Sequence, residues 1–181
     1  MSSELLRLEV TCNGIELFRA MASRAGVEVL EADAVATTNH RGELKARCRH
    51  QDWQLTVRAH FFGRQGGGQT GWELETLTGS TATLQLEHER TNTFSFWGRP
   101  EPQKLGDAEL DEEYEQHAAP FEAAKALRNE VLLRWLEETD CTGQLSLEGG
   151  KLVLSWTGDF KPELLSGALR AARAVHERLT A

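Results

Sequence analysis

Between Val27 and Trp97, apolar and polar residues alternate along the chain, and short turn sequences break the alternation at intervals. Apolar residues occupy positions 44, 46 and 48, and after residues 50–52 they resume at positions 55, 57, 59 and 61. Another break, Thr78-Gly79-Ser80, lies between a segment that begins at Trp72 and one with apolar positions 82, 84 and 86. Alternation with a period of two, broken by turn residues, predicts short strands in an antiparallel sheet with one apolar face.

The N-terminal segment predicts one more strand and a short helix. Apolar residues alternate with polar ones over residues 6–12, which is the pattern of a half-buried strand. Asn13 can cap a helix, Glu16 can complete a capping box, and Gly26 is a natural stop. We therefore expect a helix within residues 13–26.

The C-terminal part predicts two longer helices separated by a hairpin. Pro120 suits the first turn of a helix, and apolar residues then recur at helical spacing, at positions 121, 124, 127, 131, 132 and 135. Gly149-Gly150 lies between two alternating segments and indicates a tight hairpin turn. Pro162 opens a last helix. The prediction is an α+β fold: a mostly antiparallel, twisted sheet with one short N-terminal helix and two long C-terminal helices.

The length of 181 residues fits a single domain over residues 1–181, with a sub-boundary near residues 98–106, where Pro100 and Pro102 interrupt the strand pattern.

The glycine-rich stretch within residues 61–72 invites comparison with a phosphate-binding loop. Such a loop leads from a strand into a helix, whereas here the residues from Trp72 continue as a strand. A hairpin tip is the favoured interpretation.

The net charge of the chain limits the classes of molecule that it can bind. The net charge is −8, and residues 101–181 alone carry −7. Nucleic acids and anionic membranes are poor partners for such a chain, because both require a basic surface. No apolar run is long enough to span a bilayer, and Glu4 and Arg7 stand where a leader peptide would be apolar, so we expect a cytoplasmic protein. The three cysteines suggest no disulfide framework.

The densest acidic stretch is GDAELDEEYEQ, which includes Asp111, Glu112, Glu113 and Glu115. Three interpretations stay open: a solvated acidic edge, a docking surface for a basic protein, and a metal site. If the stretch is extended, Leu110 and Tyr114 share one face, and Asp111, Glu113 and Glu115 lie on the other. A calcium loop is not indicated, because the spaced oxygen ligands of such a loop are missing.

Few residues suggest catalytic or metal chemistry. His88 falls on the apolar side of its strand and reads as a packed histidine. Cys48 and His50 can share a strand face, but they do not complete a zinc site. Cys141 could pair with His117 as nucleophile and base, yet its acidic neighbours oppose thiolate formation. We therefore predict no catalytic residue, no cofactor and no bound metal.

Residues 63–181 resemble a diffuse group of uncharacterised bacterial proteins. The group shows a β-rich segment, a Gly-Asp pair, a Phe-Asp pair, an aromatic residue, a helix, a glycine-centred hairpin and a final helix. The matching residues are Gly106, Asp107, Leu110, Asp111 and Tyr114, with Leu110 in place of phenylalanine. The topology and acidity also resemble type III secretion chaperones. The first resemblance implies an architecture, and the second implies a protein-binding role.

The positions of the tryptophans suggest which residues lie in the core and which bind a partner. Trp135 and Trp156 have apolar neighbours at regular spacing and should lie in the core, whereas Trp97 and Arg99 belong to the aromatic segment FSFWGRPEP. Aromatic residues and arginine are enriched at interface hot spots, so Trp97 and Arg99 join the four acidic residues as candidate partner-binding residues.

We therefore predict a non-enzymatic adaptor, chaperone or accessory subunit in a bacterial cytoplasm. Its partner is another protein, expected to be basic, and self-association stays open. Two alternatives also stay open. One is a small-ligand-binding domain with a pocket between sheet and helices. The other is a hydrolase that uses Cys141 or the acidic stretch 107–115.

Overall fold

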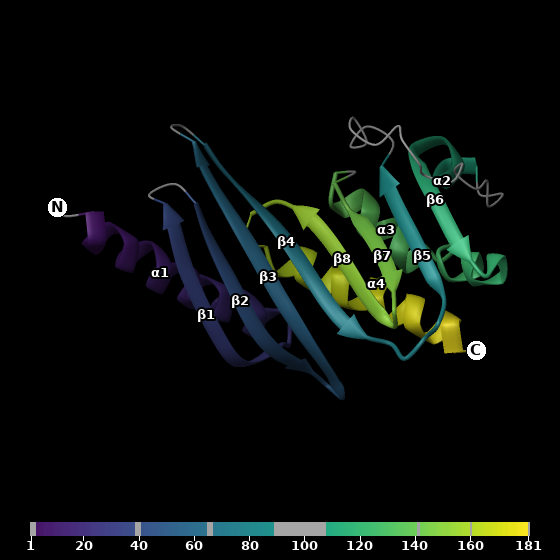
Figure 1. The fold of residues 1–181 in the computed structure, drawn as a ribbon, viewed down its shortest axis with the longest axis horizontal. Coiled ribbons are helices and arrows are strands. Elements are labelled where there is room, and N and C mark those ends of the chain that lie inside the picture. Colours follow the sequence, from purple (N-terminus) through teal and green to yellow (C-terminus); the bar gives the residue numbers. More distant parts are fainter. Residues whose placement is uncertain are drawn as a thin grey trace. The chain divides into compact units, whose positions relative to one another are not determined.

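The structure is a computed structural model, and it describes residues 3–38, 41–64, 67–88, 108–140, 142–159 and 161–180. Eight strands form one antiparallel sheet in the order β1-β2-β3-β4-β8-β7-β5-β6, accompanied by helices (Figure 1). The α+β prediction is therefore confirmed. The chain divides into two compact units, residues 1–76 with 155–166 and residues 77–154 with 167–181.

Unit 1 is a meander of hairpins with a helix beside it. Its elements are α1 (Ser3–Arg24), β1 (Glu28–Thr38), β2 (Arg41–His50), β3 (Trp53–Arg64) and β4 (Gly67–Leu77, which ends one residue past the unit boundary). Helix α1 contacts β1 and β2 (Figure 1). The predicted break near residue 51 is a two-residue turn between His50 and Trp53, and Gln51 adopts a φ of 56° there. Residues 61–64 and 67–72 of the glycine-rich stretch pair as neighbouring strands, with Arg64 opposite Gly67. The tip between them, residues 65–66, lies outside the described residues.

The core of unit 1 gathers around Trp72, which is 1% exposed. Its ring stacks on Phe18 of α1 with centroids 6.4 Å apart, and on Trp156 with centroids 6.1 Å apart. The indole Nε1 of Trp72 donates a hydrogen bond of 3.0 Å to the carbonyl oxygen of Gly158. The inward residues of the strands complete the core, including Leu44, Ala46, Cys48, Leu55, Val57, Ala59 and Leu74.

Unit 2 combines strands with helices. Its elements are β5 (Thr83–His88), α2 (Ala108–Glu113), β6 (Tyr114–Ala119), the 3-10 helix η2 (Phe121–Ala126), α3 (Glu130–Glu138) and β7 (Gln144–Glu148). Strand β5 pairs antiparallel with both β6 and β7. Strand β8 (Lys151–Thr157) and helix α4 (Pro162–Thr180) contribute residues to both units. The predicted Gly149-Gly150 hairpin is confirmed, with φ values of 57° and 77°.

The predictions for the N-terminus were wrong in part. Residues 6–12 do not form a strand, and Asn13 does not cap a helix, because both lie inside α1, which is 22 residues long rather than short. Alternation over seven residues is weak evidence for a strand in a segment rich in leucine, glutamate and arginine, which are good helix formers. The predicted stop is confirmed: Gly26 has a φ of 73°, and the amide of Val27 donates to the carbonyl of Ala22.

The helix predicted from Pro120 is interrupted. Residues 121–126 form η2, and α3 begins only after Asn129, whose backbone is extended and whose side chain accepts a 2.7 Å bond from the amide of Leu132. Asparagine is a favourable N-cap, so a new helix starts there. Only nine residues belong to α3, which corrects the prediction of two long C-terminal helices. Phe121 and Val131 are exposed, contrary to the predicted apolar stripe.

The acidic stretch is not extended throughout. Its residues 108–113 form the helix α2, and the strand β6 starts at Tyr114. The last helix agrees with its prediction, with Leu165, Ala168, Leu169, Ala172 and Val175 buried. Among the helices of the described residues, none combines the length and the apolar character needed to cross a lipid bilayer.

Candidate functional site

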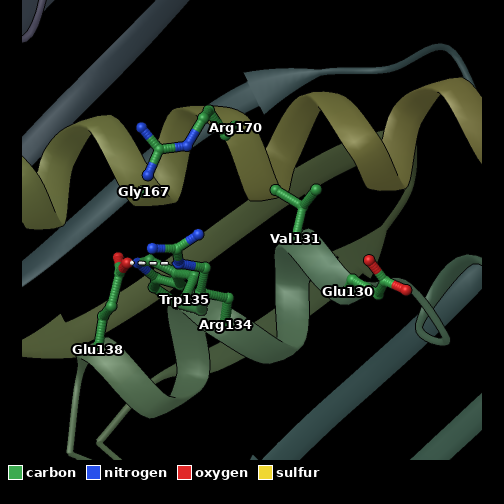
Figure 2. A pocket seen from close by; sticks show the side chains of 7 residues that line it. All are labelled: Glu130, Val131, Arg134, Trp135, Glu138, Gly167 and Arg170. Atoms are coloured by element: carbon green, nitrogen blue, oxygen red, sulfur yellow. Dashed lines mark hydrogen bonds and ion pairs between the residues drawn. The ribbon is translucent and has the colours of Figure 1, made fainter.

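A hollow of about 450 Å³ lies between α3 and α4 in unit 2 (Figure 2). Its lining consists of seven residues, Glu130, Val131, Arg134, Trp135, Glu138, Gly167 and Arg170. The hollow is open to solvent along one side. The hollow is a candidate binding site of this unit.

Helical spacing explains which residues of α3 reach the hollow. The cap at Asn129 fixes where the helix starts, and Leu132, Trp135 and Leu136 then turn into the core. Val131, Trp135 and Glu138 follow one another at intervals of four and three residues, so they form one flank of the helix. That flank changes from apolar at Val131 to acidic at Glu138.

Glycine at position 167 allows α4 to pass close to α3. A Cβ atom at this position would lie 2.9 Å from Cδ1 of Trp135 and 3.0 Å from Oε2 of Glu138, which is closer than carbon contacts normally allow. The indole therefore packs against the backbone of α4 and is 1% exposed. Val131, beside it, is 40% exposed and gives the hollow an accessible apolar surface.

Charged groups of both signs surround this apolar surface. Arg134 and Glu138 form an ion pair with Nε and Oε1 3.3 Å apart, drawn as a dashed line in Figure 2. Arg134 is largely exposed, so this pair contributes little to stability. Among the described residues, Arg170 and Glu130 have no ion-pair partner. Within the described ranges, the rim thus has one cation and one anion that form no ion pair.

The hollow combines apolar and charged side chains. Among the described residues that line it there is no serine, threonine, cysteine or histidine. The exposed Val131 suits an apolar side chain, and the guanidinium of Arg170 and the carboxylate of Glu130 suit polar groups around it.

The residues predicted from the sequence lie elsewhere. Trp97 and Arg99 are outside the described residues. Glu112 and Glu113 are exposed on α2, and Asp111 is half-buried and accepts a 3.1 Å bond from Nε2 of Gln116. Glu115 is on β6, where it pairs in register with Glu87 of β5. The structure therefore brings the four acidic residues into one short stretch of α2 and β6.

The histidines that the sequence analysis considered for metal binding make packing or hydrogen-bonding contacts in the structure. His88 is 9% exposed and packs edge-on against Tyr114, with ring centroids 5.3 Å apart, as expected for a packed histidine. His50 lies with Nδ1 3.1 Å from the carbonyl oxygen of Gly26. Cys141 is outside the described residues. Within the described ranges, no group of three or more His, Cys, Asp or Glu side chains is placed to hold a metal ion.

Sequence reasoning missed the hollow, although one signal pointed to it. Gly167 interrupts an otherwise strong helix-forming segment, and glycine inside a helix costs about 1 kcal/mol relative to alanine. Such a glycine indicates close packing. The partner of that contact, Trp135, is 32 positions earlier and can be identified only from the fold.

Burial raises the pKa of the Cys48 thiol from 9.0 to about 12. The folded chain therefore keeps this proton while the unfolded chain releases it, so the associated stability is complete below about pH 9 and is lost as the pH rises toward about 12. We expect wild type to lose on the order of 1 kcal/mol more than Cys48→Val between pH 8 and pH 10. Urea unfolding of both proteins at the two pH values measures this difference. Equal losses in the two proteins would contradict the assignment.

No protein-family model matches this chain, and no curated protein matches it either. A distant match among solved structures is the mycobacterial trehalose monomycolate transport factor A, TtfA. The match has a TM-score of 0.44 and 14% sequence identity, and it covers 90% of this chain and 94% of the other. At this level of similarity, the match assigns no function to this chain.

Proposed function

We propose that this chain binds another protein and serves as an adaptor, chaperone or accessory subunit, with the α3–α4 hollow receiving a side chain of the partner. The observation that carries the proposal is the exposed Val131 beside the buried Trp135, with Arg170 and Glu130, which have no ion-pair partner among the described residues, at the rim. Protein interfaces concentrate their binding energy where an apolar anchor enters a pocket enclosed by polar groups.

The acidity of the chain supports a basic partner. Residues 101–181 carry a charge of −7, and Glu112 and Glu113 are exposed on α2. Such charges accelerate the encounter with a basic protein, while the side chain held in the hollow slows dissociation. The resemblance to bacterial proteins supports a bacterial cytoplasm as the location of this role.

Photo-crosslinking in the host identifies the partner. A photoreactive amino acid at position 131 is expected to capture one partner, and the same group at Glu137 should not. Glu137 is an exposed residue of α3 that does not line the hollow. Equal capture from both positions would contradict the proposed site. Capture of a second copy alone would show self-association instead of binding to another protein.

The affinity of the purified partner then tests the residues of the hollow. We expect Val131→Glu to weaken binding at least tenfold, because it places a charge on the apolar anchor site, which costs more than about 1.4 kcal/mol. Arg170→Glu should weaken binding less and should change its salt dependence. Glu137→Lys is the matched control, and circular dichroism confirms that each variant folds. Unchanged affinity in Val131→Glu would contradict the proposed function.

The volume of the hollow favours one other candidate, a small-ligand-binding domain. A hollow of about 450 Å³ is within the range of small-molecule sites. Native mass spectrometry of the protein purified from its host distinguishes the two. A bound small molecule that is lost in Val131→Glu would favour the ligand-binding function.

A further inference from the structure

Strand β1 forms one end of the sheet order. It pairs with β2 along one side, and no strand in the described part of the chain pairs with its other side (Figure 1). The backbone amides and carbonyls along a strand edge are a template for a further strand. The end of unit 1 therefore offers hydrogen-bonding groups to a partner.

Two shifts in register define how much of the β1 edge is regular. The register with β2 shifts between Val29 and Glu31, and again between Ala36 and Thr38. Bulges of this kind twist an edge away from uncontrolled pairing. Between the two shifts, residues 31–36 follow β2 without interruption. An added strand can therefore pair with a segment of about six residues, which is about 20 Å long.

Three side chains of this segment share the exposed face of the sheet, Glu31, Asp33 and Val35. They lie opposite Arg47, Lys45 and Glu43 of β2 in register. Glu31 contacts Arg47 at 3.1 Å, yet its side chain is still 69% exposed and can serve a second cation. Val35 is 56% exposed. The edge thus presents two carboxylates followed by one apolar group.

Opposite charges already pair across neighbouring strands on this face. Arg58 of β3 lies 2.7 Å from Glu75 and 3.5 Å from Glu73, both on β4. Arg49 of β2 lies 2.6 Å from Glu28 of β1. A strand added beside β1 would continue this alternation if it carried basic residues opposite Glu31 and Asp33.

A second copy of this chain is a poor occupant of the edge. Antiparallel pairing of β1 with itself, centred on Asp33, places the two Asp33 side chains opposite each other. Pairing centred on Ala32 places Glu31 opposite Asp33. Like charges directly opposite each other destabilise a strand pair, so Glu31 and Asp33 disfavour self-pairing in both of these registers.

We propose that residues 31–36 of β1 accept an antiparallel strand from another protein, with basic residues opposite Glu31 and Asp33 and an apolar residue opposite Val35. Backbone hydrogen bonds supply the attraction, and the side chains supply the selectivity. The proposal does not rest on the α3–α4 hollow, which is built from different residues.

A capped seven-residue peptide tests the edge. Valine, lysine and lysine occupy its second, fourth and sixth positions, and threonine fills the others. The peptide is added to the isotope-labelled protein up to about 1 mM, and the titration is followed by NMR. The backbone amide signals of residues 31–36 should shift. Two control peptides should bind at least about tenfold more weakly. One carries glutamate in place of lysine, and the other carries N-methyl groups on the amides that would face β1.

Protein variants supply the matching control. The double variant Glu31→Gln, Asp33→Asn should bind the lysine peptide at least about fivefold more weakly than the wild-type protein does. Glu43→Gln removes a carboxylate from the same sheet face, one strand away from the edge, and should leave binding unchanged. Equal binding of the N-methylated peptide would overturn strand addition, as would shifts confined to other residues or no binding to the lysine peptide. A dimer that Val35→Lys dissociates would show that a second copy is the occupant and would also overturn the proposal.

Discussion

Replacement of Trp72 by alanine is expected to lower the free energy of unfolding by roughly 3–5 kcal/mol. The indole is 1% exposed and stacks on both Phe18 and Trp156, so its loss leaves a cavity between an α-helix and two strands. The substitution also removes the donor to the carbonyl of Gly158, which lies 3.0 Å from Nε1. A loss of this size is comparable to the whole stability of many domains.

Urea unfolding followed by circular dichroism measures the effect of Trp72→Ala. Leu77→Ala provides the control, because Leu77 is in the same strand and is 77% exposed. A change within about 0.5 kcal/mol is expected for that exposed position. If Trp72→Ala does not fold, Trp72→Phe keeps the test usable, since it retains a ring and removes only the donor and part of the volume. Near wild-type stability in Trp72→Ala would contradict the core described for unit 1.

Gly167→Ala is expected to destabilise the protein by about 1–3 kcal/mol, against the usual direction for a glycine in a helix. Helix propensity alone would favour alanine by up to about 1 kcal/mol. The new Cβ would, however, meet Trp135 at 2.9 Å and Glu138 at 3.0 Å. The carboxylate of Glu138 can move away, whereas the buried indole cannot, so the clash outweighs the gain in propensity.

A double-variant cycle separates these two effects. Trp135→Phe shortens the side chain at the contact, so Gly167→Ala should cost less in that background than in wild type. Thermal unfolding of the four proteins gives the coupling between the two positions. A stabilising Gly167→Ala in the wild-type background would show that α3 and α4 are not held at this distance.

The parts of the fold that could be predicted from the sequence are those encoded within a few residues. Gly149-Gly150 requires positive φ values, and the turn between His50 and Trp53 follows from a polar break in two alternating segments. Gly26 ends α1 by the same local chemistry. These residues specify turns and helix ends whatever surrounds them.

The parts that could not be predicted depend on residues distant in sequence. Strand β6 has the polar sequence YEQHAA, and its extended form depends on pairing with β5. The hollow requires α4 to lie against α3, so the sequence alone could not identify Val131 and Arg170 as residues that line one hollow. The edge at β1 follows from the strand order, which no local pattern encodes. The acidic stretch was visible in the sequence, but its helical part was not.

The stacking of Trp156 on Trp72 has a consequence for how the chain folds during synthesis. The segment that supplies Trp156 and Gly158 leaves the ribosome after all of β1 to β4, and Gly158 follows Trp72 by 86 positions. The apolar face of the meander therefore emerges long before its closing residues are translated. Contacts between distant residues slow folding, and exposed strands invite aggregation meanwhile. The contacts that Trp156 and Gly158 make with Trp72 are therefore absent from the nascent chain until residue 158 has emerged.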